Sequence, residues 1–306
     1  MPELPEVETT KASLAPLLGQ TVRTVDVHQP KLREMMPTDL DSLCGFVLSD
    51  VRRRAKYLLL DFVQTANNRH KTLLIHLGMS GSLQQHATDD GTPNTRKHDH
   101  LVMTFGNGAG NITALHYHDP RRFGIITWAT NDDFIDDKDS ASERYLSHLG
   151  VEPLDDAFNG EYLHAYIWRL NQANKNSPKT PKKPITKPIK ALIMEQTVVV
   201  GVGNIYAAES LFLSGIHPAT PANRLDETTI NHLVSNIKTI LANAITQGGT
   251  TLKDFTVGNG KTGYFQQVLH VYGRDGKPCT TCGTSLANVK IAGRASVYCP
   301  TCQPLK

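Results

Sequence analysis

The sequence has 306 residues, of which 39% are hydrophobic and 20% are charged. A chain of this length and composition can form two domains with ordinary cores, which excludes a largely disordered protein. It has no apolar run of about 18 residues and no basic segment followed by an apolar one at the N-terminus, so we expect a cytosolic protein without a membrane span or secretory signal.

The net charge of +3 is unevenly distributed along the chain. Residues 1–161 contain 16 Lys and Arg against 23 Asp and Glu, whereas residues 162–306 contain 16 against 6. A basic second half favours a polyanionic partner such as nucleic acid. A solvated surface explains the same asymmetry equally well.

The first predicted element is a helix that begins within "MPELPEVETT". Pro5 suits the first turn of a helix, and Glu6 and Glu8 suit the positive end of the helix dipole. These preferences leave Pro2 and Glu3 unexplained.

Five later segments alternate apolar and polar residues or form short apolar runs, and Gly, Asn and Asp separate them. Such segments are typical of β-strands. We therefore expect an N-terminal β-sandwich domain over residues 1–131, followed by an acidic linker over residues 132–146. The five segments are residues 21–29, 45–63, 71–83, 100–105 and 114–129.

The second half of the chain changes to the periodicity of helices. We expect a helical domain over residues 147–262 and a zinc finger over residues 263–306, which makes the fold class α+β. One predicted helix has Asn204 at its N-cap and Gly215 just past its end. Residues 174–188, rich in Pro and Lys, are predicted to form an exposed loop. The predicted helices are residues 160–173, 189–196, 204–215 and 227–246.

Four of the five cysteines form two pairs near the C-terminus, with the spacing C-x2-C-x16-C-x2-C. Paired cysteines in a cytosolic chain favour a metal over a disulfide, and four thiolates can close a tetrahedral structural zinc site. The spacing predicts one zinc ion but no particular function, because zinc ribbons also serve as scaffolds. Cys44 lies in an apolar stretch and is predicted to be a core residue. The predicted zinc ligands are Cys279, Cys282, Cys299 and Cys302.

Two predicted loops carry side chains that suit insertion into a DNA base stack from which one base has been displaced. "DPRRFG" contains Arg121 and Phe123, and "HLGMSG" contains Met79. An exposed arginine beside an exposed apolar side chain can hold open a gap between bases. The alternative is that Phe123 and Met79 are core residues.

Three further features have alternative explanations. Arg294 lies at the turn of the cysteine-rich hairpin, where it can enter a groove or remain a solvated turn residue. "VVVGVGNIYAAE" places glycines at a helix start, which suits a phosphate, but a tight turn between helices explains it equally well. The run of Arg52, Arg53, Arg54 and Lys56 is typical of a solvated strand face.

The opening residues suggest a nucleophile. If Met1 is removed after synthesis, the secondary amine of Pro2 becomes the chain terminus. An α-amine has a pKa near 8 and is a better nucleophile at neutral pH than a lysine with a pKa of about 10.4. Its attack on a sugar C1′ gives an iminium, and the adjacent Glu3 can transfer protons. The terminus is therefore a candidate active site.

These motifs resemble those of the formamidopyrimidine-DNA glycosylases, the bacterial 8-oxoguanine glycosylases and abasic-site lyases. The resemblance covers nearly the whole chain. It implies a bifunctional enzyme of base excision repair, with a β-sandwich domain, a helix–two-turn–helix domain and a zinc finger, and with DNA between the domains. The motifs are "PELPEVETT", "RRRAKYLLL", "HLGMSG", "KHDH", "DPRRFG", "VVVGVGNIYAAES", "GGTTLKDF", "GYFQQVLHVYGR" and the cysteine pairs.

The resemblance also implies catalytic roles. Pro2 would be the Schiff-base nucleophile, and Glu3 would donate a proton. Lys56 would be the donor for β-elimination, and Arg294 would be the donor for δ-elimination from the zinc finger.

Further residues would bind the DNA. Arg121 would face the cytosine left unpaired by the everted base, and Thr256 to Thr262 would form the loop that covers that base. The residues expected to fill the gap are Met79, Arg121 and Phe123. The residues expected to hold phosphates are His98, Lys187, Lys190 and Asn204.

Two alternative functions remain. The endonuclease VIII group shares the terminal proline and zinc finger but removes oxidised pyrimidines, and "PELPEVET" with "DPRRFG" favours the purine enzyme. A non-catalytic zinc-ribbon DNA-binding protein would account for the basic half and the cysteines, but it would not need Pro2, Glu3 or Lys56.

One departure from the family is the length of residues 174–188, which looks greater than in the usual connection. The extra residues are expected to lengthen a surface loop beside the DNA. We expect a monomer in the bacterial cytoplasm, associated with the nucleoid, that binds double-stranded DNA containing oxidised purines or abasic sites and has zinc as its cofactor.

Overall fold

The computed structural model describes residues 2–88, 93–106, 108, 110–131, 141–170, 183–248 and 269–305. Most of these residues fall into two compact units, residues 2–148 and residues 149–244 with 269–305. Each unit is described by itself. Within these ranges, no helix is both long enough and apolar enough to cross a membrane.

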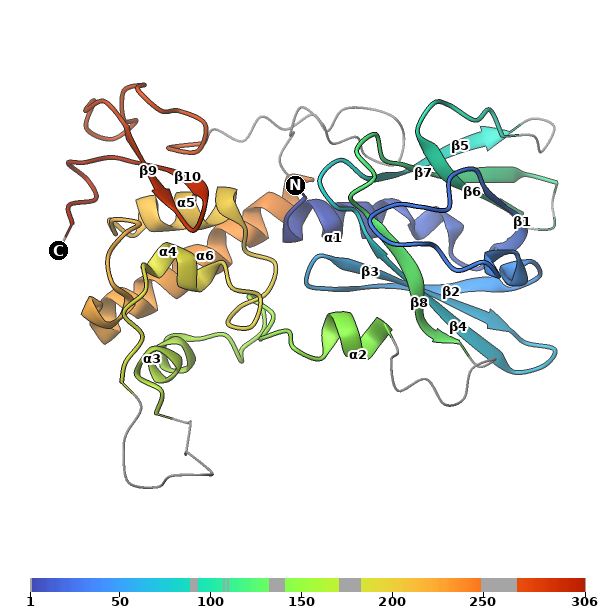
Figure 1. Ribbon diagram of the computed structural model, residues 1–306, viewed down its shortest axis with the longest axis horizontal. Helices are drawn as coiled ribbons and strands as arrows, with labels where there is room; N and C mark the ends of the chain where they lie inside the picture. The colour runs from blue at the N-terminus through green and yellow to red at the C-terminus, as the bar shows by residue number, and fades with distance from the viewer. Residues whose placement is uncertain are drawn as a thin grey trace. The chain divides into compact units, whose positions relative to one another are not determined.

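The first unit contains one long helix and an eight-stranded sheet (Figure 1). The chain starts with α1 (Leu4–Ser13) and the short 3₁₀ helix η1 (Ala15–Leu17). A second 3₁₀ helix, η2 (Leu40–Leu43), precedes β2, and α2 (Ala141–Leu146) follows β8. The strands are β1 (Thr21–Val27), β2 (Val47–Arg54), β3 (Tyr57–Gln64), β4 (Arg69–His76), β5 (Ser82–Thr88), β6 (Asp99–Gly106), β7 (Ile112–His118) and β8 (Ile125–Asn131).

The strands pair antiparallel in the order β5-β7-β6-β1-β2-β3-β4-β8. β1 meets β2 at Thr21 and Val47, the first residue of each strand. The sheet folds at this junction into two four-stranded layers (Figure 1). Apolar side chains from both layers, such as Phe105 and Phe62, share one core. The expected β-sandwich is confirmed.

β6 is buried along its whole length, although Asp99, His100 and Thr104 are polar. Its apolar residues Leu101, Met103 and Phe105 belong to the core between the layers. Because side chains alternate along a strand, His100 and Thr104 lie on the opposite face, and a register shift between Asp99 and Leu101 interrupts the alternation at Asp99. Buried polar groups need hydrogen-bond partners, and Thr104 has one in the hydroxyl of Thr24 at 2.8 Å. The first residues of β6 therefore lie in a polar layer.

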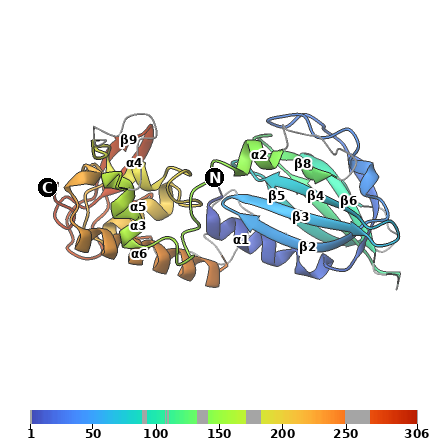
Figure 2. The same cartoon turned by 90° about the horizontal axis from the view of Figure 1, so that it is seen from below.

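The second unit is made of helices and a hairpin (Figure 2). α5 is its central helix, because every residue from Ile205 to Phe212 is buried. α6 is amphipathic, and its buried residues Ile230, Leu233, Val234 and Ile237 recur at helical spacing. The elements are α3 (Gly160–Trp168), α4 (Ile189–Ile193), α5 (Asn204–Leu213), the 3₁₀ helix η3 (Ala222–Arg224), α6 (Glu227–Thr246), β9 (Ala287–Ile291) and β10 (Arg294–Tyr298).

Two local expectations from the sequence are wrong. The N-cap of α5 is Gly203, so Asn204 is the first residue inside the helix. Cys44 is exposed rather than part of the core, because it lies in the turn between η2 and β2. The position of Gly215 is confirmed: it follows the C-cap Ser214 with a φ of 64°, a conformation that favours glycine.

The last part of the predicted linker is helical. Tyr145 and Leu146 of α2 pack against Leu59 and Leu74 of the sheet. The finer division into linker, helical domain and zinc finger stays a prediction. Of the Pro- and Lys-rich loop, residues 174–182 lie outside the described residues.

Candidate functional site

Pro2 and Glu3 are buried at the start of α1. Glu3 is the N-cap and forms a capping box with Glu6. The Glu6 carboxylate is fully buried, and its Oε2 accepts from the Glu3 N–H at 2.8 Å. Because this N–H belongs to the peptide bond that follows Pro2, the capping box holds the backbone next to Pro2.

Arg53 joins α1 to the turn that carries Lys56. Its Nε donates to Glu8 Oε2 at 2.6 Å, and its Nη1 donates to the Ala55 carbonyl at 3.0 Å. Burial alone would raise the pKa of Glu8, but hydrogen bonds from Lys11 and Arg53 hold that pKa below its ordinary value. Lys56 follows Ala55 in the tight turn between β2 and β3 and is 7% exposed. The arginine run is therefore only partly a solvated face.

His76, at the end of β4, lies in the same region. Burial, followed by the charges of Lys56 and Arg33, lowers the pKa of His76 to about 4. The imidazole is therefore neutral at neutral pH. Its Nδ1 accepts from the Gly78 N–H at 3.1 Å, which holds the start of the turn that contains Met79.

The two apolar loop residues are exposed. Met79 is 40% exposed and Phe123 is 44% exposed, so neither belongs to the core. Arg121 is also exposed, and its guanidinium lies over the Phe123 ring at 4.8 Å from the centroid. The arrangement predicted from the loop sequences, a cation beside apolar side chains, is present.

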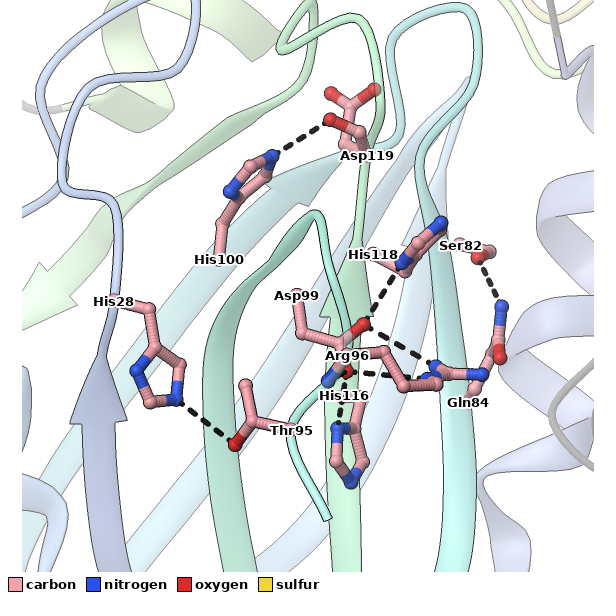
Figure 3. A network of polar contacts seen from close by, with 10 residues as sticks. All are labelled: His28, Ser82, Gln84, Thr95, Arg96, Asp99, His100, His116, His118 and Asp119. Carbon is pink, nitrogen blue, oxygen red and sulfur yellow. Dashed lines mark hydrogen bonds and ion pairs between the residues drawn. The ribbon is translucent and has the colours of Figure 1, made fainter. Parts of the chain in front are cut away.

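His98 lies in a turn that a buried carboxylate closes. The backbone of His98 has a φ of 73°, and the turn precedes β6. Asp99 Oδ2 accepts from the Arg96 N–H at 2.9 Å, and both Asp99 oxygens face the Arg96 guanidinium at 3.3 Å (Figure 3). His116 and His118 of β7 reach the same carboxylate through Nδ1 at 3.0 and 2.9 Å.

These contacts outweigh the cost of burying Asp99. Burial alone would raise its pKa, but the hydrogen bonds from His116, His118 and Arg96 hold that pKa well below its ordinary value. The charged carboxylate therefore holds the turn of His98 throughout the neutral range.

In the second unit, Lys190 and Lys187 differ in their surroundings. Lys190 is 1% exposed, and its Nζ donates to Ser296 Oγ at 2.7 Å and to the Ala295 carbonyl at 3.3 Å. Lys187 is exposed and forms an ion pair with Glu195. Lys190 therefore connects α4 to β10, where Arg294 is the first residue.

Asn204 and Arg294 lie at the ends of two elements. Asn204 is in the first turn of α5, and its Oδ1 is buried without a hydrogen-bond partner among the described residues. Arg294 is exposed at the tight turn between β9 and β10, where Ala292 and Gly293 have φ values of 47° and 76°. The hairpin-tip position predicted for Arg294 is confirmed.

A buried glutamate fastens the segment before this hairpin. Glu209 of α5 is 4% exposed, and its carboxylate accepts from the backbone N–H groups of three successive residues at 2.8 to 2.9 Å. Those residues are His270, Val271 and Tyr272. Such a carboxylate anchors the chain that leads into the hairpin.

The four paired cysteines converge beside the hairpin. Their sulfur atoms all lie within 4.8 Å of one another. Cys279 Sγ and Cys302 Sγ are 3.9 Å apart, and Cys282 Sγ and Cys299 Sγ are 3.4 Å apart. Thiolates at about 2.3 Å from a tetrahedral zinc ion are separated by about 3.8 Å. The donor set and its spacing therefore fit one structural zinc ion.

The structure thus brings the site residues together in two groups. In the first unit, Pro2, Glu3 and Lys56 are linked through α1, and the gap-filling residues share two neighbouring turns. In the second unit, Lys190 contacts the hairpin that carries Arg294, and the two cysteine pairs flank that hairpin in the chain. The loop of residues 256–262 lies outside the described residues. The sequence prediction missed the supporting residues Glu6, Arg53, His76, Asp99 and Glu209, of which Glu6 was detectable as the third residue after an N-cap.

Models of three domains match the chain. The formamidopyrimidine-DNA glycosylase N-terminal domain matches residues 1–126, and the formamidopyrimidine-DNA glycosylase H2TH domain matches residues 149–256. The zinc finger found in FPG and IleRS matches residues 276–305.

Full-length relatives carry the same family name. The chain is 54% identical to a formamidopyrimidine-DNA glycosylase of Psychrobacter arcticus, with 100% of this chain and 99% of the relative covered. It is 47% identical to one of Acinetobacter baylyi, with the same coverage. The chain belongs to the formamidopyrimidine-DNA glycosylase family, whose members are DNA glycosylases and abasic-site lyases.

Solved structures agree in fold. The MutM (Fpg) protein of Thermus thermophilus has a TM-score of 0.77 at 32% identity, with both chains covered completely. The Fpg of Lactococcus lactis, in complex with DNA containing N7-benzyl-Fapy-dG, has a TM-score of 0.79 at 32% identity, with 99% of this chain and 100% of that chain covered.

We expect acid to destabilise the first unit through His76. The unfolded chain takes up a proton at a pKa of about 6.5, whereas the folded chain does so at about 4. The stability that depends on this ring is complete above about pH 6.5, falls with decreasing pH, and stops falling below about pH 4. Each pH unit in this window costs up to about 1.4 kcal/mol.

The measurement is urea unfolding between pH 7 and pH 4, followed by Trp128 fluorescence in a Trp168→Phe variant. His76→Gln keeps a hydrogen-bond acceptor but does not titrate, so the pH dependence should be shallower in this variant. An equal slope with and without His76 would contradict the assignment.

Zinc removal should unfold the hairpin, because about 25 residues cannot form an independent core without a metal. Cys299→Ser should lose the metal and weaken DNA binding while the first unit stays folded. Metal analysis and DNA titration measure both effects. Cys44→Ser removes a cysteine outside the cluster and should retain zinc and binding. Strong DNA binding by a zinc-free protein would disprove this role.

Proposed function

We propose that this chain removes oxidised purines such as 8-oxoguanine and formamidopyrimidines from double-stranded DNA, and then cleaves the strand at the abasic site. The relatives are named formamidopyrimidine-DNA glycosylases. Related solved complexes contain Fapy-dG, 8-oxo-G or abasic-site DNA. The proposed site of action is the bacterial cytoplasm, at the nucleoid.

The observation that carries this proposal is the linkage of Pro2, Glu3 and Lys56 through α1. Glu6 holds the peptide bond after Pro2, and Arg53 connects the same helix to the turn of Lys56. A nucleophile and its proton donors must be held in fixed geometry for efficient catalysis. A non-catalytic DNA-binding protein has no need of this linkage.

In the proposed reaction, Met1 has been removed and the Pro2 amine attacks C1′ of the damaged nucleotide. The base leaves with the electron pair of the glycosidic bond and takes up the proton that the Pro2 nitrogen releases. Glu3 donates a proton to the ring oxygen of the sugar, and the opened sugar remains attached to Pro2 as an iminium. The buried carboxyl of Glu3, next to Pro2 in the chain, suits this role.

The iminium then acidifies the proton on C2′. Loss of that proton expels the 3′-phosphate, and a second elimination expels the 5′-phosphate. We assign Lys56 to the first elimination and Arg294 to the second. The exposed position of Arg294 at a hairpin tip supports its access to DNA.

The proposed gap-filling group is Met79, Arg121 and Phe123. The exposed Met79 and Phe123 side chains can replace an everted base, because both are apolar. The contact of the Arg121 guanidinium with the Phe123 ring orients the cation. A guanidinium facing the unpaired cytosine can donate to its O2 and N3 atoms.

The remaining contacts are proposed for phosphates. His98 lies on the turn that Asp99 closes, Lys187 is exposed, and Asn204 lies at a helix N-terminus, which favours anions. Lys190 is buried against the hairpin, where its Nζ donates to Ser296 Oγ, and it is assigned to a phosphate from the family resemblance alone. The loop of residues 256–262 remains assigned to the everted base from the family resemblance.

The Pro2 assignment predicts a covalent adduct. Borohydride should trap the protein on abasic or 8-oxoguanine DNA, and mass spectrometry after proteolysis should place the adduct on Pro2. Pro2→Gly keeps an amine but loosens it, so base excision should fall steeply while DNA binding persists. Glu3→Gln should reduce excision by about 10²-fold or more, and cleavage of a preformed abasic site should survive in part.

The matched control is Glu161→Gln, which changes an exposed glutamate in the first turn of α3 and should retain full excision. Lys56→Ala should slow cleavage of a preformed abasic site, because the first elimination is assigned to Lys56. An adduct on a lysine, or full activity in protein that retains Met1, would refute the assignment.

The Arg121 assignment predicts a preference for the opposite base. Excision of 8-oxoguanine should be faster opposite C than opposite A, by a factor equivalent to about 1 to 3 kcal/mol. Single-turnover rates on the two duplexes measure the preference. Arg121→Ala should remove it, and Arg122→Ala should keep it. Equal rates opposite C and A in the wild type would rule out this role.

A further inference from the structure

Asp119 is a fully buried carboxylate that the proposed chemistry does not use. Its Oδ1 accepts from the Ser80 hydroxyl at 2.6 Å and from the Arg121 N–H at 3.2 Å. Its Oδ2 accepts from the Gly124 N–H at 2.9 Å and from the Tyr117 hydroxyl at 3.3 Å. Four donors therefore converge on one carboxylate.

Three of these donors belong to the two turns that carry Met79, Arg121 and Phe123, and the fourth, Tyr117, belongs to β7. Ser80 follows Met79 directly, and Arg121 and Gly124 lie on either side of Phe123. The Ser80 hydroxyl also accepts from the Arg121 N–H at 3.3 Å, so the two turns share a hydrogen bond beside the carboxylate. Asp119 is the common acceptor of both turns.

The backbone of Asp119 connects a third segment. Its N–H donates to the His98 carbonyl at 3.0 Å, and its own carbonyl accepts from His100 Nε2 at 2.7 Å. Figure 3 shows the His100 ring directed at this carbonyl, beside the Asp99 cluster. The turn that carries His98 is therefore fastened to the same residue.

Glycines allow the two turns to approach each other at the backbone. A Cβ on Gly78 would lie 2.4 Å from the Phe123 carbonyl carbon. A Cβ on Gly124 would lie 1.7 Å from the Tyr117 hydroxyl. A displacement of one turn must therefore move the other.

We propose that Asp119 is the positioning residue that holds Met79, Arg121 and Phe123 in register for insertion into DNA. This inference rests on the proposed function. Asp119 acts through the two turns and does not touch the DNA. Its loss should affect the choice of the opposite base, because that choice depends on where the Arg121 guanidinium lies.

Asp119→Asn tests the carboxylate with little change in shape. An amide has one acceptor oxygen, so its NH2 group must face either the Arg121 N–H or the Gly124 N–H. The amide NH2 group then faces a backbone N–H, and two donors cannot form a hydrogen bond. The loop loses its attachment to residue 119 at that end. Ser80→Ala is the milder variant, because it removes one donor and leaves the carboxylate intact.

The experiment measures single-turnover excision of 8-oxoguanine opposite C and opposite A. Both variants should lower the C-to-A rate ratio by about two- to tenfold, as expected for the loss of one hydrogen bond. The control is Thr72→Val. This change removes a hydroxyl that donates to Asp61 Oδ1 at 2.6 Å, which is also the length of the hydrogen bond from Ser80 to Asp119. This control should keep the wild-type ratio.

A purely structural role would lower stability and total activity and leave the C-to-A ratio unchanged. That result in Ser80→Ala and in Asp119→Asn would overturn the inference, and Ser80→Ala alone decides if Asp119→Asn does not fold. If the wild-type protein excises no oxidised purine, the proposed function itself fails. If it excises without preference for C, the Arg121 role fails and the inference fails with it.

Discussion

The functional segments of this protein are held by buried carboxylates that accept hydrogen bonds from backbone N–H groups. Glu6 holds the peptide bond after Pro2, Asp99 closes the turn of His98, Asp119 holds the loop of Phe123, and Glu209 anchors the chain before the zinc hairpin. Burying a charge is costly unless hydrogen bonds replace its water. Each of these side chains therefore requires a defined backbone around it.

The regular elements and the loops therefore have different roles. The two layers of the sandwich supply an apolar core, and α5 supplies a buried centre for the second unit. In the first unit, Met79, His98, Arg121 and Phe123, which are proposed to meet DNA, stand on turns, where strand geometry does not limit their direction. Arg53 and Lys190 extend the principle to cations, because each uses its donors to join a helix to a hairpin turn or strand.

The sequence was most informative where a pattern depends on local chemistry. The zinc cysteines are readable from spacing alone, and α6 has the expected bounds because its apolar residues recur at the helical period. The exposure of Met79 and Phe123 and the burial of Lys190 depend on contacts between distant segments, which composition does not reveal. Cys44 is exposed because a turn, rather than its apolar neighbours, decides its position. For the same reason Asp99 and Asp119, which sit in recognisable motifs, could not be identified as acceptors before their donors were placed.

The packing around Tyr117 brings it against two glycines, Gly124 in the next turn and Gly81 in a distant part of the chain. The Tyr117 hydroxyl lies where a side chain at Gly81 or Gly124 would begin, with a Cβ at 2.8 Å and 1.7 Å respectively. A phenol at position 117 is therefore compatible only with glycine at 124. At position 81 the Leu77 carbonyl oxygen, 2.3 Å from the Cβ position, also excludes a side chain. In other members of the family positions 117 and 124 should therefore vary together: a chain that has a larger residue at 124 needs a shorter one in place of the tyrosine. A larger side chain at position 124 would push the two turns apart unless position 117 also changed, because the two residues compete for the same space.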